Sequence, residues 1–124
     1  MTYALFDPIS MTLTCARAGH TPFVRVPAGP PGHRPAEVLA PDGMVLGLNL
    51  DRGERFERYL CEVSIPLGRG DLFFFFTDGI SEAMDRAGES FGETRVVTFL
   101  EAHADLTPEA IRDRLMADIA AFVR

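Results

Sequence analysis

The sequence lacks the features that mark secreted, membrane-spanning and nucleic-acid-binding proteins. It has only two cysteines, Cys15 and Cys61, without CxxC or Cys/His spacing, so it offers no disulfide framework that would indicate secretion. No basic segment followed by an apolar one stands at the N-terminus, so we expect no signal peptide. The longest apolar run, residues 72–76, is far shorter than the roughly 20 residues of a membrane-spanning helix.

Basic residues are also scarce. There are 12 Lys and Arg against 18 Asp and Glu, for a net charge of −6. A general nucleic-acid binder needs an excess of cations to neutralise phosphates, so we expect no nucleic-acid partner. The acidic balance is common among soluble cytoplasmic proteins, and we expect this location. It also suits a protein that gathers carboxylates around divalent cations.

What is present is typical of a folded domain. Apolar residues make up 47% and charged residues 24% of the 124 residues, close to the average of globular proteins. We find no internal repeat and no linker that would separate two domains. The sequence therefore predicts one domain, or a piece of one, over residues 1–124.

The first part of the chain predicts strands joined by turns. A hairpin is expected around the Asp7-Pro8 turn, made of residues 3–6 and the alternating residues 11–15. Residues 23–26 resume as a strand, and the proline-rich segment 27–35 is expected to be an exposed loop. Short extended pieces are expected at residues 37–40 and 44–46.

Two further strands are expected. Residues 56–65 alternate with an apolar face that should lie in the core, made of Tyr59, Cys61, Val63 and Ile65. Residues 71–77 form a continuous apolar run with four phenylalanines, which predicts a strand buried on both faces. We interpret Cys15 and Cys61 as small core residues.

The last part of the chain predicts helices. Residues 93–104 have an apolar stripe. The last helix starts with Thr107 as N-cap and Pro108 at the first position, and its apolar face is Ile111, Leu115, Ile119 and Phe122. Strands followed by helices indicate an α+β fold with mostly antiparallel sheets.

The tripeptide Thr77-Asp78-Gly79 is the sharpest candidate for chemistry. A carboxylate at the end of a buried strand is held rigidly at a sheet edge, where it can bind a hard divalent cation. We expect Gly79 to let the backbone turn sharply and to keep the site open. The alternative from spacing alone is that Asp78 caps the following turn, because Asp-Gly is an ordinary turn pair.

Several collinear segments resemble the bacterial SpoIIE/RsbU type of PP2C (PPM) serine/threonine phosphatases. Residues 70–83, GDLFFFFTDGISEA, are similar to the PGDxxxxYTDGxxEA segment of that family. The other similar segments are the hairpin, the AGHxP stretch at 18–22, the short LG segment at 44–48 and the GExFG stretch at 88–92. Together these matches cover nearly the whole chain.

The resemblance implies a sandwich of antiparallel sheets flanked by helices. It implies hydrolysis of phosphoserine or phosphothreonine at a two-cation Mn²⁺ or Mg²⁺ centre, which activates a water and clamps the phosphoryl oxygens. Of that centre only Asp78 carries over directly, as a catalytic metal ligand. The implied substrate is a phosphorylated regulatory protein, such as an anti-sigma-factor antagonist.

The chain departs from the family at both ends. The first metal motif of the family, of the Asp-Val-x-Gly-His-Gly type, lies upstream of the matched hairpin, and the Asp-Asp-x-Thr motif follows the last helix. We expect both to be missing, so that residues 1–124 are a partial domain that binds metal poorly and is inactive alone. A non-catalytic, phosphatase-like binding module is the alternative, and an accidental match on a generic α+β domain is a third.

Three further expectations remain open. His20 either orients water or phosphate or fixes its loop through hydrogen bonds to the backbone. Glu82 either lies beside Asp78 or faces solvent. An incomplete sandwich exposes a sheet edge, which favours self-association as a homodimer.

Overall fold

The computed structural model describes residues 1–30, 34–48 and 52–124. In this part of the chain the elements are β1 (Thr2–Asp7), β2 (Thr12–Arg17), β3 (Phe23–Val26), β4 (Glu37–Leu39), α1 (Glu54–Tyr59), β5 (Glu62–Pro66), β6 (Leu72–Phe74), α2 (Asp78–Ser81), α3 (Gly92–His103) and α4 (Pro108–Phe122). The predicted order, strands first and two long helices last, is confirmed.

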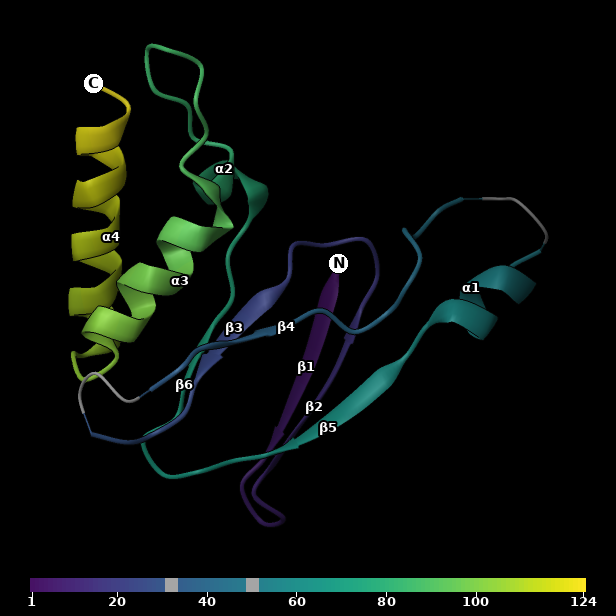
Figure 1. The fold of residues 1–124 in the computed structure, drawn as a ribbon. Coiled ribbons are helices and arrows are strands. Elements are labelled where there is room, and N and C mark those ends of the chain that lie inside the picture. The colour runs from purple at the N-terminus through teal and green to yellow at the C-terminus, as the bar shows by residue number, and fades with distance from the viewer. Residues whose placement is uncertain (31–33, 49–51) are drawn as a thin grey trace.

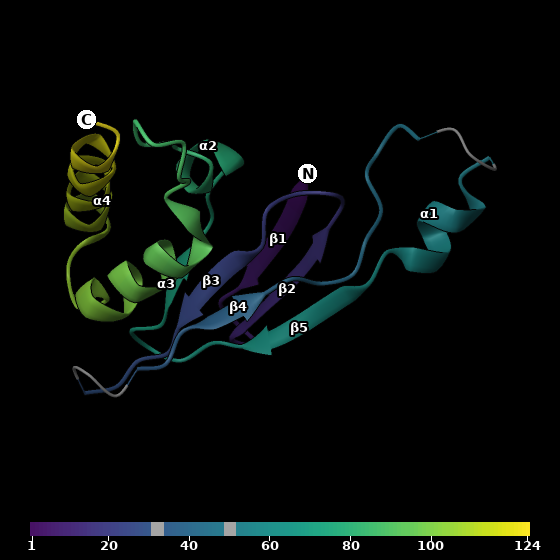
Figure 2. The same cartoon turned by 45° about the horizontal axis from the view of Figure 1, so that its top comes forward.

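The strands form two antiparallel sheets, and the two long helices lie on one side of them (Figure 1). The strand orders are β1-β2-β5 and β4-β3-β6. A second view shows α3 and α4 gathered beside the second sheet, away from β1, β2 and β5 (Figure 2). The structure is therefore α+β with antiparallel sheets, as predicted, in the layer order sheet, sheet, helices.

A small core joins the two sheets. Leu13 and Cys15 on β2 lie opposite Ile65 and Val63 on β5, and directly opposed residues share one face of a sheet. This face packs against Phe23 of β3, and Leu13, Cys15 and Phe23 are each at most 5% exposed. The alternation predicted for the hairpin and for Val63 and Ile65 is confirmed.

The phenylalanine run serves two cores, because successive side chains of a strand point to opposite faces. Phe73 packs toward the first sheet, whereas Phe74 and Phe76 pack toward the helices. The prediction of complete burial is wrong: β6 has only three residues, all half-buried, and Phe75 is 44% exposed. The strand is an edge strand that pairs with β3 alone in the described part of the chain.

The larger core lies between the second sheet and the helices. Val96 and Leu100 of α3 and Ile111 and Leu115 of α4 are almost completely buried, on the stripes that the helical period predicts. They pack with Val24, Val26, Phe76, Phe91, Phe99 and Ile119.

We predict that Thr107→Ala lowers the free energy of unfolding by about 1 kcal/mol. The Thr107 side chain accepts a hydrogen bond of 3.3 Å from the Ala110 N–H, as an N-cap does, and alanine would leave that donor to water. Urea denaturation measures the change. Thr98→Ala, on the exposed side of α3, is the control and should not lower stability, because alanine is the better helix former.

The strand predicted over residues 56–65 is half wrong. Residues 54–59 form α1, which projects from the body at the end far from α3 and α4 (Figures 1 and 2). Gly53, at φ 94°, begins the helix, and acidic Glu54 and Glu57 in the first turn with basic Arg58 in the last suit the helix dipole. Phe56 and Tyr59 are also three residues apart, so the apolar residues of this short segment fitted the period of a helix as well as that of a strand.

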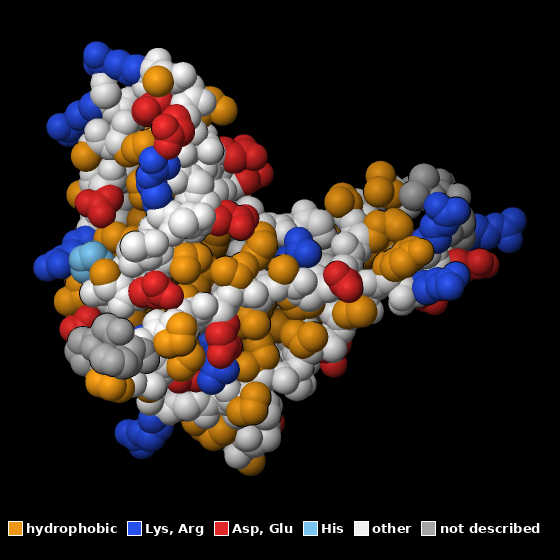
Figure 3. Space-filling model, viewed as in Figure 1, with side chains coloured by type: hydrophobic (Ala, Val, Ile, Leu, Met, Phe, Trp, Pro, Cys, Tyr) orange, Lys and Arg blue, Asp and Glu red, His pale blue; other side chains and the backbone are white. Residues whose placement is uncertain are grey.

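The projecting helix has no buried residue. Charged side chains gather at this end of the molecule (Figure 3). Tyr59 is 55% exposed and Cys61 is exposed, so the prediction that both lie in the core is wrong. Cys15, by contrast, is fully buried as predicted.

The remaining local predictions have mixed outcomes. The strand at 37–40 is confirmed as β4, but residues 44–46 form no strand. The predicted loop at 27–35 has no helix or strand in its described residues, and residues 31–33 lie outside them. No helix in the described ranges is long and apolar enough to cross a membrane.

Candidate metal-binding site and adjoining pocket

Asp78 stands at the first position of α2, just after the chain leaves β6. It is exposed, and its backbone oxygen accepts a 2.7 Å hydrogen bond from the Glu82 N–H. No described group donates a hydrogen bond to the Asp78 carboxylate, and α2 has no side-chain cap. The Asp78 side chain therefore does not cap the turn that follows it, and both carboxylate oxygens are free to bind a ligand.

Of the two roles expected of Gly79, the structure does not require the first, a sharp backbone turn. Gly79 lies inside α2, and its φ is outside the left-handed region, so the turn does not require glycine. A Cβ at this position would meet only the Thr77 hydroxyl, at 3.7 Å. What glycine contributes here is the absence of a side chain beside the Asp78 carboxylate.

Glu82 follows α2 as its C-cap and is exposed to solvent. The described ranges contain no group of three or more His, Cys, Asp or Glu side chains that could hold a metal ion. A two-cation centre needs several bridging carboxylates. The described residues therefore do not fit such a centre by themselves, and Asp78 offers a single ligand.

His20 is tied to its own loop and, through Thr21, to the segment before Asp78. Thr21 donates its hydroxyl proton to the Phe76 carbonyl oxygen over 2.6 Å. The same hydroxyl lies 3.0 Å from His20 Nδ1 and has no second proton, so Nδ1 must be the donor there. A 3.3 Å contact from Nδ1 to the Thr21 carbonyl, which can only accept, agrees with this assignment.

The hydrogen bonds therefore favour the loop-fixing interpretation of His20. They also determine the tautomer, since Nδ1 carries the proton and Nε2 keeps its lone pair when the ring is neutral. His20 does not reach Asp78 through any hydrogen bond of the described structure. The two residues predicted for the same site are linked only indirectly, through Thr21 and Phe76.

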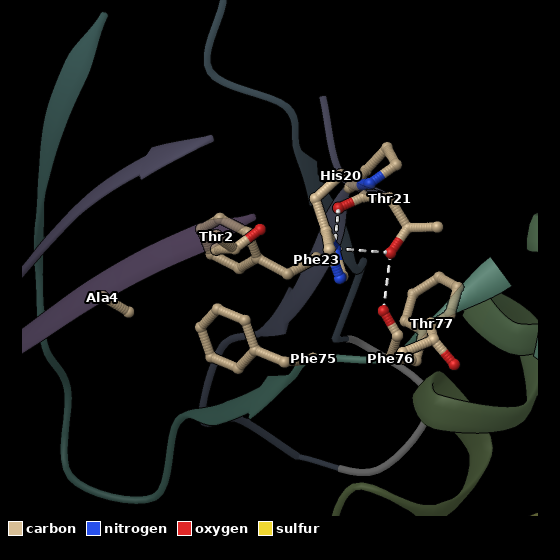
Figure 4. Close-up of a pocket in the computed structure, with 9 residues that line it drawn as sticks. Thr2, Ala4, His20, Thr21, Phe23, Phe75, Phe76 and Thr77 are labelled. Carbon is tan, nitrogen blue, oxygen red and sulfur yellow. Dashed lines mark hydrogen bonds between the residues drawn. The ribbon is translucent and has the colours of Figure 1, made fainter. Parts of the chain in front are cut away.

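A cavity of about 370 Å³ lies beside His20 (Figure 4). Its walls come from β1, from the loop between β2 and β3, and from the segment after β6; the lining residues are Thr2, Ala4, His20, Thr21, Pro22, Phe23, Phe75, Phe76 and Thr77. Thr77 immediately precedes Asp78, which does not itself line the cavity. The Phe23 and Phe75 rings stack here at 4.6 Å between centroids.

Thr2, which lines this cavity, has a hydroxyl with no partner in the described structure. This hydroxyl is buried and makes no hydrogen bond, although burying a hydroxyl without a partner costs about 1–3 kcal/mol. Figure 4 shows Thr2 and Ala4 on β1, across the cavity from His20. Thr2 carries no sequence signal, and Phe75 was expected inside a buried strand, so sequence reasoning missed both.

Asp71, in the same sequence segment as Asp78, holds β6 to β3. Its side chain is 4% exposed and receives the Arg25 guanidinium at 2.8 and 3.1 Å. It also accepts the N–H groups of Ala28 and Gly68, each at 2.9 Å. Burial would raise the pKa of Asp71, but these N–H groups and Arg25 together hold the pKa below its ordinary value. The role is structural, and no sequence pattern predicted it.

Comparison with known proteins matches this arrangement to one family and one fold. The family described as Stage II sporulation protein E (SpoIIE) matches residues 1–123. The SiaA-PP2C domain of Pseudomonas aeruginosa superposes with a TM-score of 0.71 at 19% identity over 98% of this chain. The manganese-presoaked phosphatase domain of SpoIIE from Bacillus subtilis gives 0.66 at 16% identity, again over 98%.

The chain spans 43% and 48% of those two domains. No curated protein matches the sequence. The fold is thus that of part of a PP2C domain, as the resemblance implied.

Proposed function

Because the chain belongs to the SpoIIE family, we propose that it forms part of a metal-dependent serine/threonine protein phosphatase in which Asp78 is a metal ligand. The observation that carries this proposal is the Asp78 carboxylate, which is exposed at the first position of α2 and engaged by no described donor. Carboxylate oxygens are the ligands that Mg²⁺ and Mn²⁺ favour.

The other ligands of the proposed centre would come from polypeptide outside these 124 residues. Among the described residues, Asp78 belongs to no group of three or more side chains that could hold a metal ion. One carboxylate does not hold two divalent ions. The proposed substrate is a phosphorylated regulatory protein of the cytoplasm, such as an anti-sigma-factor antagonist. The support for this substrate is the family membership alone.

A second candidate is a non-catalytic, phosphatase-like module that docks a protein partner. The same lack of a ligand cluster in the described ranges favours it. The coding sequence on either side separates the two candidates. If neither an Asp-x-x-Gly-His nor an Asp-Asp-x-Thr segment flanks residues 1–124, catalysis is excluded and the docking module remains.

We predict that the 124 residues alone show no Mn²⁺-dependent hydrolysis of p-nitrophenyl phosphate above background. In a longer protein that carries the flanking motifs, Asp78→Asn should lower kcat at least about 100-fold, because it removes a metal ligand. Glu82→Gln, at the exposed C-cap of α2, is the matched control and should retain most of the activity. Asp78-dependent turnover by the short chain would contradict the prediction of inactivity.

A further inference from the structure

The chain leaves the second sheet before it reaches α2. The register of β3 with β6 ends where Val24 lies opposite Phe74. Continued by two residues, this register places Pro22 opposite Phe76, and proline has no N–H to donate to the Phe76 carbonyl. Residues 75–77 belong to no strand or helix. The sheet ladder therefore does not fix the main chain just before α2.

A side chain supplies the missing donor. The Thr21 hydroxyl donates to the Phe76 carbonyl oxygen over 2.6 Å and accepts from His20 Nδ1 over 3.0 Å (Figure 4). Thr21 has little freedom of its own, because it is β-branched and precedes a proline, which confines its backbone to the extended region. The hydroxyl is thus held from both sides, and it fixes the main chain two residues before Asp78.

The loop that carries His20 and Thr21 is anchored in turn. Arg17, at the end of β2, donates from Nη1 to the His20 carbonyl over 2.6 Å. Gly19 has a φ of 61°, and a Cβ there would lie 2.2 Å from Val45 Cγ2, so the path of the loop requires glycine. The position of the Thr21 hydroxyl is therefore set by the first sheet and its loop.

We propose that Thr21, held by His20, is a positioning residue for Asp78. The Thr21 hydroxyl fixes the Phe76 carbonyl and, through it, the start of α2, where the Asp78 carboxylate stands. This helix has four residues and no side-chain cap, and a single helical turn is weakly stable by itself. The inference rests on the proposed function, because that function needs the carboxylate at a fixed place. In this role His20 acts through Nδ1, and Nε2 is not used.

Residue-resolved hydrogen exchange of the 124-residue chain tests the positioning. The Ile80 N–H donates to the Thr77 carbonyl at 3.0 Å. The Glu82 N–H donates to the Asp78 carbonyl at 2.7 Å, so exchange at both amides reports whether this turn is held. Thr21→Val removes the hydroxyl at almost unchanged volume and should speed exchange at both amides at least about fivefold. Thr21→Ser keeps a hydroxyl and should stay within about twofold of the parent.

Thr14→Val is the matched control. It also removes a threonine hydroxyl from a side-chain hydrogen bond, to Ser64 at 3.0 Å, but this bond joins β2 to β5 and not the chain before α2. Exchange at Ile80 and Glu82 should be unchanged in this variant. The amides of α4 report global unfolding. An equal rise in α4 would show that Thr21→Val destabilises the whole fold, and the proposal would then be wrong.

Two replacements of His20 separate the roles of its two nitrogen atoms. An asparagine amide can stand where Nδ1 stands and donate to the Thr21 hydroxyl, whereas a glutamine amide reaches the place of Nε2. His20→Asn should therefore keep exchange at Ile80 slow, and His20→Gln should speed it at least about threefold. The opposite order would assign the role to Nε2 and overturn the proposal.

Kinetics with p-nitrophenyl phosphate, in a longer protein that carries the flanking motifs, tests the consequence for catalysis. Thr21→Val should lower kcat at least about tenfold and change KM less than about twofold, because misplacing a group that serves the reaction slows it without weakening substrate binding. Thr21→Ser should restore most of kcat.

The two kinds of failure are distinguishable. An unchanged kcat in Thr21→Val, in a protein that Asp78→Asn inactivates, would overturn the positioning role and leave the proposed function standing. If Asp78→Asn itself leaves kcat unchanged, the proposed function fails. Exchange at Ile80 then decides alone: faster exchange in Thr21→Val supports the positioning of this turn, and unchanged exchange overturns it.

Discussion

Asp71→Asn is expected to lower the free energy of unfolding by about 2–3 kcal/mol at neutral pH. The side chain is 4% exposed and is held by the Arg25 guanidinium and two backbone N–H groups. Asparagine keeps one acceptor oxygen but loses the charge and places an NH₂ group among donors. Arg25, itself only 17% exposed, would keep only its 3.3 Å ion pair with the more exposed Glu37, with little solvent to replace the Asp71 carboxylate.

The loss should also depend on pH. The folded-state pKa of Asp71 is below its ordinary value of 3.8, so the ionised carboxylate stabilises the fold above about pH 4. This stabilisation disappears as the pH falls through the folded-state pKa. The difference between the parent and Asp71→Asn should therefore shrink as the pH falls below about 4.

Urea denaturation at several pH values measures both effects. Asp7→Asn is the control. Local hydrogen bonds from Ser10 and Ile9 lower the pKa of Asp7 too, but its side chain lies at the end of β1, where it bonds only the turn that follows. We expect a change of less than about 1 kcal/mol for this variant. A loss for Asp71→Asn that is the same at pH 3 and pH 7 would show that the charge of Asp71 does not stabilise the fold.

Gly43→Ala is expected to destabilise the protein by about 3 kcal/mol or more. A Cβ at Gly43 would overlap the carbonyl oxygen of Arg17 and lie 2.9 Å from its carbonyl carbon. Both are backbone atoms, so no rotamer change relieves the overlap. The glycine is needed for the close approach of two chain segments rather than for its φ, which is not left-handed.

Neither segment can easily move away. Arg17 pairs with Thr2 at the end of β2, and its side chain donates to the carbonyls of Pro41 and His20 at 3.2 and 2.6 Å. The segment that contains Gly43 is held as well, because the Cys61 N–H donates to the carbonyl of the preceding residue, Asp42, at 2.9 Å.

Thermal or urea denaturation of Gly43→Ala measures the effect. Gly79→Ala is the matched control, because its new Cβ meets only the Thr77 hydroxyl at 3.7 Å and its φ is ordinary. The control should change stability by less than about 1 kcal/mol. A Gly43→Ala variant as stable as this control would show that the two segments are free to separate.

The sequence by itself determined the elements whose signals are local. The N-cap at Thr107 and the spacing of Ile111, Leu115 and Ile119 predicted α4, and the alternation around Leu13 and Cys15 predicted the hairpin. The segment around Asp78 predicted the family and the end of the strand at which this carboxylate stands. Each of these signals lies within a few residues, where capping and side-chain period depend on the chain alone.

Only the tertiary structure decided the features that depend on residues far apart in the chain. The sequence of residues 54–59 fitted either a strand or a helix. In the structure these residues form α1, and no residue of this helix is buried. Phe75 remained exposed because no described strand pairs beyond β6. Arg25 and Ala28 lie 46 and 43 residues from Asp71, and Phe76 lies 55 residues from Thr21. No local pattern encodes such contacts. Asp78 therefore lies at the first position of α2, beyond the end of β6, and the surroundings that decide what it can bind are set by packing.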